Sequence, residues 1–291
     1  SRRIAGGMTA PVTVAALQYC AAGTSQETLA FLLPMIGDAA EQGARIVSLP
    51  EAATFLAANR KTLEAEAEDE SASPTLDALR TCAAGRGIDL HVGSIFLRRA
   101  DGRLVNRAVM IGPDGSVRAQ YDKIHMFDAN VGDGKRYRES DHFAAGDSMV
   151  LAEACGWQLG LSICYDLRFP HLYRQLGLAG AEMIMVPAAF TYPSGRAHWH
   201  VLLRARAIET GCFVVAAAQC GTHADGRRTY GHAVIISPWG KVVAEVPTDD
   251  DAAEAGANDG IALATLDHGM VAKARDAIPS LATNPDFSRD G

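Results

Sequence analysis

Short apolar runs rich in β-branched residues alternate along this chain with segments of helical periodicity, and this alternation constrains the fold more than any other feature. The run "VTVAALQY" (12–19) predicts a buried strand. The segment "TSQETLAFLLPMIGDAAEQG" that follows predicts a helix with Thr24 or Ser25 as its N-cap and Gly43 at its end. The next strand is expected over 44–51. Strand–helix alternation with several hairpins is typical of a mixed sheet covered by helices.

The same pattern continues to the end of the chain. Further helices are expected over 72–86, from Pro170 onward, and in "RAHWHVLLRARAIETG". The remaining strands are expected in "DLHVGSIFLRR", "LVNRAVMIGPDGSVRAQYDK", "WQLGLSICYD", "EMIMVPAAF", "CFVVAAAQCG", "GHAVIISPWGKVVAEV" and "GIALATLD".

Neither a repeat of fixed period nor a break in composition divides the chain, so we expect one domain over 1–291. The acidic stretches 63–70 and 249–259 are predicted to be exposed surface or loops. We expect residues 1–10 to be disordered or derived from a purification tag, and 277–291 to form an extended tail.

Composition excludes several classes of partner. With 48% hydrophobic residues the chain can bury a large core, and a net charge of -7 argues against bulk attraction to nucleic acid or to an anionic membrane. No apolar run reaches the roughly 18–20 residues that a membrane helix needs. The cysteines form no C-x-x-C pair, so we expect no metal site and reduced thiols in the cytoplasm. They are Cys20, Cys82, Cys155, Cys164, Cys212 and Cys220.

Three expected strand ends carry reactive side chains: Glu51 in "SLPEAATF", Lys123 in "QYDKIHMFD" and Cys164 in "SICYDLRFP". Catalytic groups favour such loops, because the sheet holds them rigidly while the loop exposes them. If the three converge, Glu51 could accept the thiol proton and Lys123 could stabilise an oxyanion. The backbone N–H of Tyr165 would be a second oxyanion donor.

Each residue also has a purely structural interpretation. Cys164 could be a packed core thiol, Glu51 could begin a helix, and Lys123 could be a solvated hairpin residue. Spacing alone leaves these alternatives open.

Taken together, these segments resemble the signatures of the nitrilase, or carbon–nitrogen hydrolase, superfamily, whose triad is Glu, Lys and Cys. Further matches are "PAAFTYPSGRAHWHVLLRARAIETGCFVVAAAQCG" and "TYGHAVIISPWGKVVAE", and the likeness runs from about residue 12 to about residue 275. The chain looks most similar to the Nit branch of deaminated glutathione amidases, with the ω-amidases next. The resemblance implies a four-layer α-β-β-α sandwich that pairs as a homodimer or a larger homo-oligomer.

The resemblance also implies roles for individual residues. Glu51 matches the general base, Lys123 the oxyanion lysine and Cys164 the nucleophile. Glu139, in "RYRESDHFAAGD", matches a second glutamate that positions the lysine and the substrate amide. From the sequence alone Glu139 would be taken for a surface residue of a charged loop.

Residues expected to line the pocket follow two of these strands. Arg168 matches a position that contacts the substrate carboxylate in related carbamoyl hydrolases, although an ion pair with Asp166 explains it equally well. Phe190 and Thr191 are expected at the pocket wall. His200 departs from the family, which commonly has Glu after "HW", and this change would alter the charge near the pocket. His125, His142 and His198 receive no role.

The implied activity is hydrolysis of a small linear amide bearing a carboxylate, through a cysteine thioester and with release of ammonia, without a cofactor. The specific substrate that the resemblance implies is deaminated glutathione. The alternative is ω-amidase activity on 2-oxoglutaramate-type substrates or N-carbamoyl hydrolase activity. Nitrile hydrolysis fits less well. A catalytically silent scaffold of the same fold is the alternative outside the enzyme class. A papain-like protease lacks support, because nothing around Cys164 matches its signatures.

Overall fold

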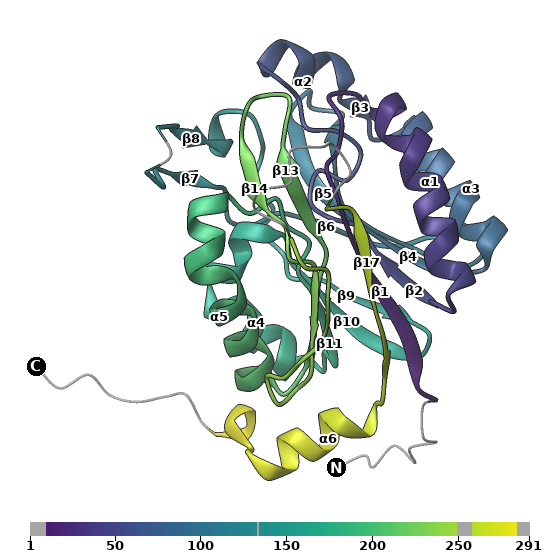
Figure 1. Cartoon of the computed structure of the whole chain (residues 1–291), viewed down its shortest axis with the longest axis vertical. Helices are drawn as coiled ribbons and strands as arrows, with labels where there is room; N and C mark the ends of the chain where they lie inside the picture. The colour runs from purple at the N-terminus through teal and green to yellow at the C-terminus, as the bar shows by residue number, and fades with distance from the viewer. Residues whose placement is uncertain (1–9, 133, 249–257, 284–291) are drawn as a thin grey trace, which may run out of the picture.

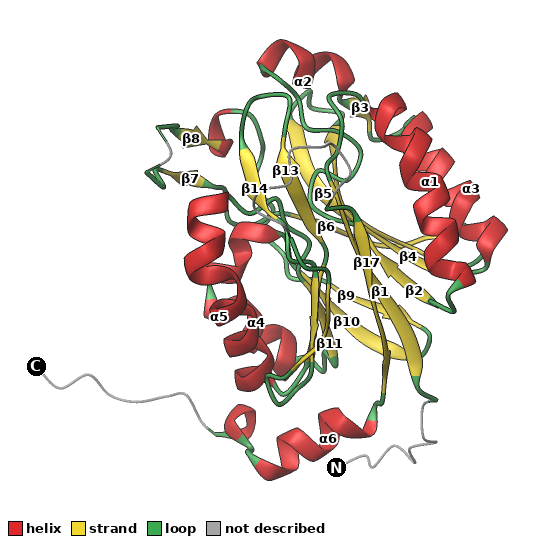
Figure 2. Cartoon of the chain, in the orientation of Figure 1, coloured by secondary structure: helices red, strands yellow, loops and turns green. Residues whose placement is uncertain are grey.

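The computed structural model describes residues 10–132, 134–248 and 258–283, and it has four layers. Two β-sheets face each other, and helices cover the outer face of each sheet (Figures 1 and 2). This α-β-β-α arrangement confirms the expected fold class. No helix among the described residues combines the length and apolarity required to cross a lipid bilayer.

The first sheet has nine strands in the order β14-β13-β1-β2-β4-β5-β6, with β17 paired to β1 and β3 paired to β4. Strands β1, β2 and β4 are parallel, whereas β17, β5 and β6 join by antiparallel pairing. Its strands are β1 Val12–Tyr19, β2 Ile46–Ser48, β3 Glu68–Asp69, β4 Asp89–Arg98, β5 Leu104–Ile111, β6 Val117–Asp122, β13 Ala218–Thr222, β14 Arg228–Tyr230 and β17 Gly260–Leu266.

The second sheet has six strands in the order β16-β15-β12-β11-β10-β9, and the strands β10, β11 and β12 at its centre are parallel. A separate two-stranded ribbon, β7-β8, lies beside the main body (Figure 1). The strands are β7 Asp128–Ala129, β8 Tyr137–Arg138, β9 Leu151–Ala154, β10 Trp157–Leu161, β11 Met183–Met185, β12 Phe213–Ala216, β15 Val234–Ile236 and β16 Val242–Glu245.

Two helices cover each sheet on its outer side, α1 and α3 on the first sheet and α4 and α5 on the second (Figure 2). Thr24 caps α1 by accepting a hydrogen bond from the Glu27 amide, as the sequence predicts. The helices are α1 Ser25–Glu41, α2 Arg60–Glu66, α3 Pro74–Arg86, α4 Pro170–Leu178, α5 Tyr192–Thr210 and α6 Gly269–Ala277, with the 3-10 turns η1 Glu139–Asp141, η2 Cys164–Arg168 and η3 Ser280–Ala282.

The two faces of β1 explain why the sheets stack. Successive side chains of a strand point to opposite faces. Val14 and Ala16 belong to the core that lies between the sheets, whereas Ala15 and Leu17 pack in the core beneath α1 and α3. A strand that is apolar on both faces, as the run "VTVAALQY" is, fits only a sheet covered on both sides.

The structure departs from the sequence prediction in the stretch 63–70 and at the C-terminal tail, among other segments. The stretch 63–70 was expected to be loop or exposed surface, but it contains the end of α2 and the strand β3, because Leu63 and Ala67 are buried with Phe55. Part of the expected C-terminal tail is also ordered, since η3 packs against α4. There Arg174 donates hydrogen bonds to the carbonyls of Ser280 and Leu281. Residues 1–9, 249–257 and 284–291 lie outside the described residues.

Candidate active site

The expected reactive residues come from both sheets. Glu51 follows β2 and Lys123 follows β6, and both strands end at the same edge of the first sheet. Cys164 follows β10 of the second sheet and begins η2. Glu139 begins η1, after the small ribbon. Stacking of the two sheets is therefore what brings these four side chains together.

A buried cluster of charges forms around Lys123, which is 2% exposed. Its Nζ donates to Glu51 Oε1 at 2.7 Å and to the two carboxylate oxygens of Glu139 at 3.0 and 2.8 Å. Asn106 Nδ2 donates to the same two carboxylates, at 3.0 Å to Glu51 and 3.1 Å to Glu139. Since buried charges are tolerated only when paired and hydrogen-bonded, these contacts hold all three charged groups in one arrangement.

Glu51 is also fixed by Ala189, which follows β11 of the second sheet, and by Gln219 of β13 in the first sheet. Its Oε2 accepts the backbone N–H of Ala189 at 2.9 Å, and the Cys164 thiol lies near enough to the same carboxylate to affect the pKa of both groups. Gln219 donates to the backbone carbonyls of Glu51 and Ala52, each at 3.1 Å. One glutamate thus binds the ammonium and neighbours the thiol.

The surroundings set the charge state of each group. Burial by itself raises the pKa of Glu51, but the Lys123 charge and hydrogen bonds from Lys123 and the Cys164 thiol outweigh it, so the pKa lies below its ordinary value. Burial lowers the pKa of Lys123, yet Glu139 and Glu51 together raise it above its ordinary value. Burial and the Glu51 charge raise the pKa of the Cys164 thiol well above its usual range, against the opposing Lys123 charge. The resting site therefore holds a carboxylate, an ammonium and a neutral thiol.

Cys164 occupies a strained turn. Its φ of 47° lies in the left-handed region, which non-glycine residues seldom adopt, and its backbone N–H donates to the Pro187 carbonyl at 2.9 Å. Such strain is concentrated at functional sites, where the surrounding structure holds it in place. The turn from β10 into η2 places Cys164 at the cavity, a position comparable to that of the nucleophile in a nucleophile elbow.

A second buried network, which the sequence reasoning missed, holds this turn. Asp166 is fully buried, and its carboxylate accepts from the Tyr121 hydroxyl at 2.7 Å and from the Ile163 amide at 2.9 Å. It also contacts both the backbone N–H and the ring Nδ1 of His125, at 3.0 and 2.6 Å. His125 follows Lys123 by two residues, and Asp166 follows Cys164 by two. Their contact therefore connects the segment that carries the lysine to the turn that carries the cysteine.

The cluster forms the floor of a cavity of about 340 Å³. All of the predicted site residues line it: Glu51, Lys123, Glu139, Cys164, Tyr165, Arg168, Phe190 and Thr191. The sequence reasoning did not anticipate several polar and cationic lining residues, namely Asn106, Arg60, Arg136, Arg138, His142 and Arg227. They come from several elements, among them α2 for Arg60, β5 for Asn106 and β8 for Arg138, and no local motif marked them.

The structure separates the two interpretations of Arg168. Asp166, the expected alternative partner, is occupied by the contacts described above. Arg168 instead lies against the Phe190 ring, 5.1 Å from its centroid, and contacts His198 Nδ1 at 3.2 Å. Its guanidinium is a lining group of the cavity. Phe190 packs on Trp199 at 5.2 Å, so it serves both the core and the wall.

His200 does not alter the charge of the pocket as expected, because it is absent from the cavity lining. It contacts Glu245, at the end of β16, at 2.9 Å. Together with His232, these residues form the one group of three or more His, Cys, Asp or Glu side chains within the described residues that is spaced to hold a metal ion.

A neutral thiol beside a carboxylate and an ammonium, at the floor of a cavity, is an arrangement suited to acyl transfer through cysteine. The comparisons agree with this class. Residues 13–276 match the Carbon-nitrogen hydrolase family, and the chain belongs to that family. It is therefore a carbon–nitrogen hydrolase.

Particular relatives are similar over nearly the whole chain. A deaminated glutathione amidase of Synechocystis sp. is 40% identical over 93% of this chain and 97% of that protein. The C. elegans NitFhit protein superposes with a TM-score of 0.85 at 32% identity, over 96% of this chain and 66% of that chain. A mutant amidase from Nesterenkonia sp. AN1, with the acetamide moiety of fluoroacetamide added covalently to its active-site cysteine, gives a TM-score of 0.75 at 25% identity, over 95% and 97% of the two chains.

Proposed function

We propose that this protein is an amidase that cleaves the C–N bond of a small linear amide bearing a carboxylate, through a thioester at Cys164. The observation that carries the proposal is the position of Glu51, whose carboxylate accepts from the Lys123 ammonium at 2.7 Å beside the Cys164 thiol, in a cavity that all three residues line. The single hydrolase domain would need no cofactor, because these groups supply every proton transfer.

In the first half of the reaction, Cys164 Sγ attacks the amide carbon while Glu51 accepts the thiol proton. A carbon–sulfur bond forms, and the carbonyl electron pair moves to the oxygen. Lys123 and the backbone N–H of Tyr165 would stabilise this oxyanion. The intermediate then collapses: the C–N bond breaks, Glu51 returns its proton to the departing nitrogen, and a thioester remains.

In the second half, Glu51 removes a proton from a water molecule, whose oxygen attacks the thioester carbon. The C–S bond breaks, the thiolate is reprotonated by Glu51, and the carboxylic acid leaves. Glu139 and Asn106 act as positioning residues in this scheme. Glu139 accepts from Lys123, and Asn106 donates to Glu51 and Glu139, so together they fix the Lys123–Glu51 pair.

The charge of the cavity supports a carboxylate-bearing substrate. Five arginines line it, and guanidinium groups suit bidentate binding of carboxylates. They are Arg60, Arg136, Arg138, Arg168 and Arg227. Deaminated glutathione, the substrate in the name of the Synechocystis relative, carries two carboxylates, and we propose it as the substrate. ω-Amidase and N-carbamoyl hydrolase activities are the second candidates.

The leaving group distinguishes these candidates. The amide nitrogen of deaminated glutathione belongs to its cysteine residue, so its leaving group is cysteinylglycine and not the ammonia expected from the sequence. Ammonia would come from a primary amide such as 2-oxoglutaramate. Assaying 2-oxoglutarate from deaminated glutathione, and ammonia from 2-oxoglutaramate and carbamoyl amino acids, ranks the three activities directly.

The variant Cys164→Ala tests the mechanism. We expect hydrolysis to fall by at least about 10³-fold, because removal of a nucleophile leaves only binding and oxyanion contributions. Circular dichroism should remain that of the wild type, and mass spectrometry of wild-type protein quenched during turnover should show an acyl group on Cys164. Full activity in the variant would overturn the mechanism, and a protein inert toward all of these amides would favour the scaffold alternative.

We also propose a cytoplasmic homodimer. Its support is a set of exposed apolar side chains on α5 and the β15–β16 turn, where Val201 is 67%, Ile208 52% and Trp239 61% exposed. Large exposed apolar side chains that gather on one face mark interaction surfaces. Light scattering coupled to size exclusion should give twice the chain mass for wild type and a smaller species for Val201→Asp. A wild-type monomer would contradict the proposal.

A further inference from the structure

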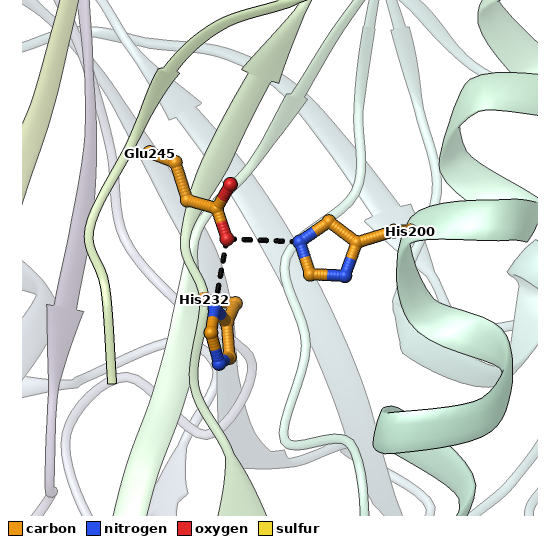
Figure 3. A group of neighbouring side chains, drawn as sticks. All are labelled: His200, His232 and Glu245. Atoms are coloured by element: carbon orange, nitrogen blue, oxygen red, sulfur yellow. Dashed lines mark hydrogen bonds and ion pairs between the residues drawn. The ribbon is translucent and has the colours of Figure 1, made fainter. Parts of the chain in front are cut away.

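A second polar cluster lies outside the cavity and has no part in the proposed reaction. It consists of His200 on α5, His232 in the corner between β14 and β15, and Glu245 at the end of β16. Figure 3 shows the three side chains pointing toward one another. One carboxylate oxygen, Glu245 Oε1, lies 2.9 Å from His200 Nε2 and 2.7 Å from His232 Nδ1.

The backbone at His232 is held in an unusual conformation. Its φ of 58° lies in the left-handed region, where histidine is one of the few residue types that is enriched. Its N–H donates to Thr248 Oγ1 at 3.1 Å, and its carbonyl accepts from Trp199 Nε1 at 2.9 Å. The Tyr230 ring stacks on the imidazole at 4.4 Å. The ring is therefore positioned before any ligand arrives.

The donor atoms suit a transition-metal ion. Two imidazole nitrogens and one carboxylate oxygen lie within 4.8 Å of one another. Zinc binds such atoms at about 2.0–2.2 Å, which in a tetrahedral site separates them by roughly 3.3 Å. The present contacts would therefore open by only a few tenths of an ångström. The side chains of His200, His232 and Glu245 are 31%, 19% and 28% exposed, so a water molecule can reach a fourth position.

We propose that His200, His232 and Glu245 form a binding site for one divalent transition-metal ion, with zinc as the probe, that clamps α5 to β15 and β16. Two histidines with one carboxylate match the preference of Zn²⁺ and of its neighbours Co²⁺ and Ni²⁺. When the ion binds, the two ring N–H hydrogen bonds to Glu245 are replaced by metal–ligand bonds. Each ring keeps one proton, which moves to its other nitrogen.

The site is tested by metal titration of the full chain carrying Cys164→Ala, so that this thiol cannot compete for the ion. We expect isothermal titration and native mass spectrometry to give one Zn²⁺ per chain after removal of metal with a chelator. Saturating Zn²⁺ should raise Tm, because an ion that binds only the folded state stabilises it. Co²⁺ should give visible d–d absorption without a thiolate charge-transfer band.

Single substitutions locate the ion. In the same background, His200→Gln and Glu245→Gln should each weaken Zn²⁺ binding by more than about 100-fold, since loss of an outer-sphere partner alone costs about 10- to 100-fold. His232→Asn tolerates the left-handed backbone and should do the same. His171→Gln, on the exposed start of α4, is the matched control and should leave the Kd unchanged.

The results are decisive in both directions. Saturable binding that the three ligand variants remove and His171→Gln keeps would establish the site. Absence of binding near micromolar Zn²⁺, or equal affinity in the ligand variants, would overturn it. The cluster would then be a hydrogen-bond network between one glutamate and two histidines. A thiolate band with Co²⁺ would assign the ion to another cysteine and overturn it as well.

Discussion

The protein contains two clusters built in the same way and placed in opposite surroundings. In each, a single glutamate oxygen lies between two nitrogen atoms. Glu51 Oε1 contacts Lys123 and Asn106 in the buried cluster, and Glu245 Oε1 contacts two histidines in the exposed one. The side chains are 2% and 8% exposed in the Lys123–Glu51 pair but 19% to 31% exposed in the second cluster.

This difference in burial decides what each cluster can do. Because the side chains of the buried cluster are almost fully shielded from solvent, their charges must compensate one another. Such an arrangement suits proton transfer between the groups, but removing any one charged group from it costs much free energy. At the exposed cluster, water and ions can replace the hydrogen bonds with little loss of stability. The first is suited to chemistry and the second to reversible binding.

Removal of the buried cation should have the largest effect. Lys123→Met leaves the carboxylates of Glu51 and Glu139 without their ammonium, so we expect a loss of about 3–5 kcal/mol in the free energy of unfolding. Activity should fall by at least about 10²-fold through loss of oxyanion stabilisation. Urea denaturation and product assays measure the two. Lys241→Met, at an exposed position, is the control. Equal effects of both substitutions would contradict the difference between buried and exposed charges.

Loss of the Asp166 network, which joins the Lys123 segment to the Cys164 turn, should have the second-largest effect. Asp166→Asn replaces an acceptor of four hydrogen-bond contacts with a side chain that brings two donors of its own. We expect about 1–3 kcal/mol of destabilisation, because buried groups then lose their partner. The rate should fall as well, since His125 and the nearby Lys123 lose their link to the cysteine turn. A wild-type rate and pH profile in this variant, with no loss of stability, would show that Asp166 has no positioning role. Asp147→Asn is an exposed control.

The pH dependence of stability gives a smaller effect with a definite sign. The folded pKa of Glu51 lies below the ordinary 4.5, so its contribution to stability is present above about pH 4.5 and is lost as the pH falls toward the folded pKa. Wild type should therefore lose more free energy of unfolding than Glu51→Gln between pH 5.5 and about pH 3.5. Urea unfolding at a series of pH values gives both curves. Parallel curves would mean that the pKa of Glu51 is not lowered on folding.

The exposed cluster should respond least when no metal is present. Glu245→Gln keeps one acceptor oxygen and removes a partly solvated charge, so its effect on the free energy of unfolding should stay below about 1 kcal/mol. If Glu245→Gln lowered the free energy of unfolding of chelator-treated protein by several kcal/mol, this cluster would be as important for stability as the buried one. Chemical denaturation before and after addition of Zn²⁺ separates the two cases.

Local sequence pattern predicted most elements and marked candidate reactive residues, whose roles came from the family resemblance. Strands β1, β2 and β10 follow from short apolar runs, and α1 follows from its periodicity and the Thr24 cap. Cys164 and Glu51 stood out because a reactive side chain just past a buried strand is exposed by the following loop. Glu139 could be identified only through the family resemblance, since its charged loop gives no local signal.

Other elements depended on contacts that local patterns do not show. The helix α2 lies in an acidic segment with weak periodicity, and it is stabilised by burial of Leu63 against Phe55. The helix α6 was not predicted, and only Val271 of this helix is buried. Tertiary packing outweighs local preference in such segments.

By itself, the sequence determined the layer type, the family and the positions of the thiol, the carboxylates and the ammonium along the chain. Only the tertiary structure decided which neighbours these groups have. Asn106 joins Glu51 to Glu139, Asp166 pairs with His125 instead of Arg168, and His200 meets Glu245 away from the cavity. The physical reason is that pKa values, hydrogen bonds and metal affinity depend on distances of a few ångströms between residues far apart in the chain. Those distances are fixed by how the two sheets and α5 pack.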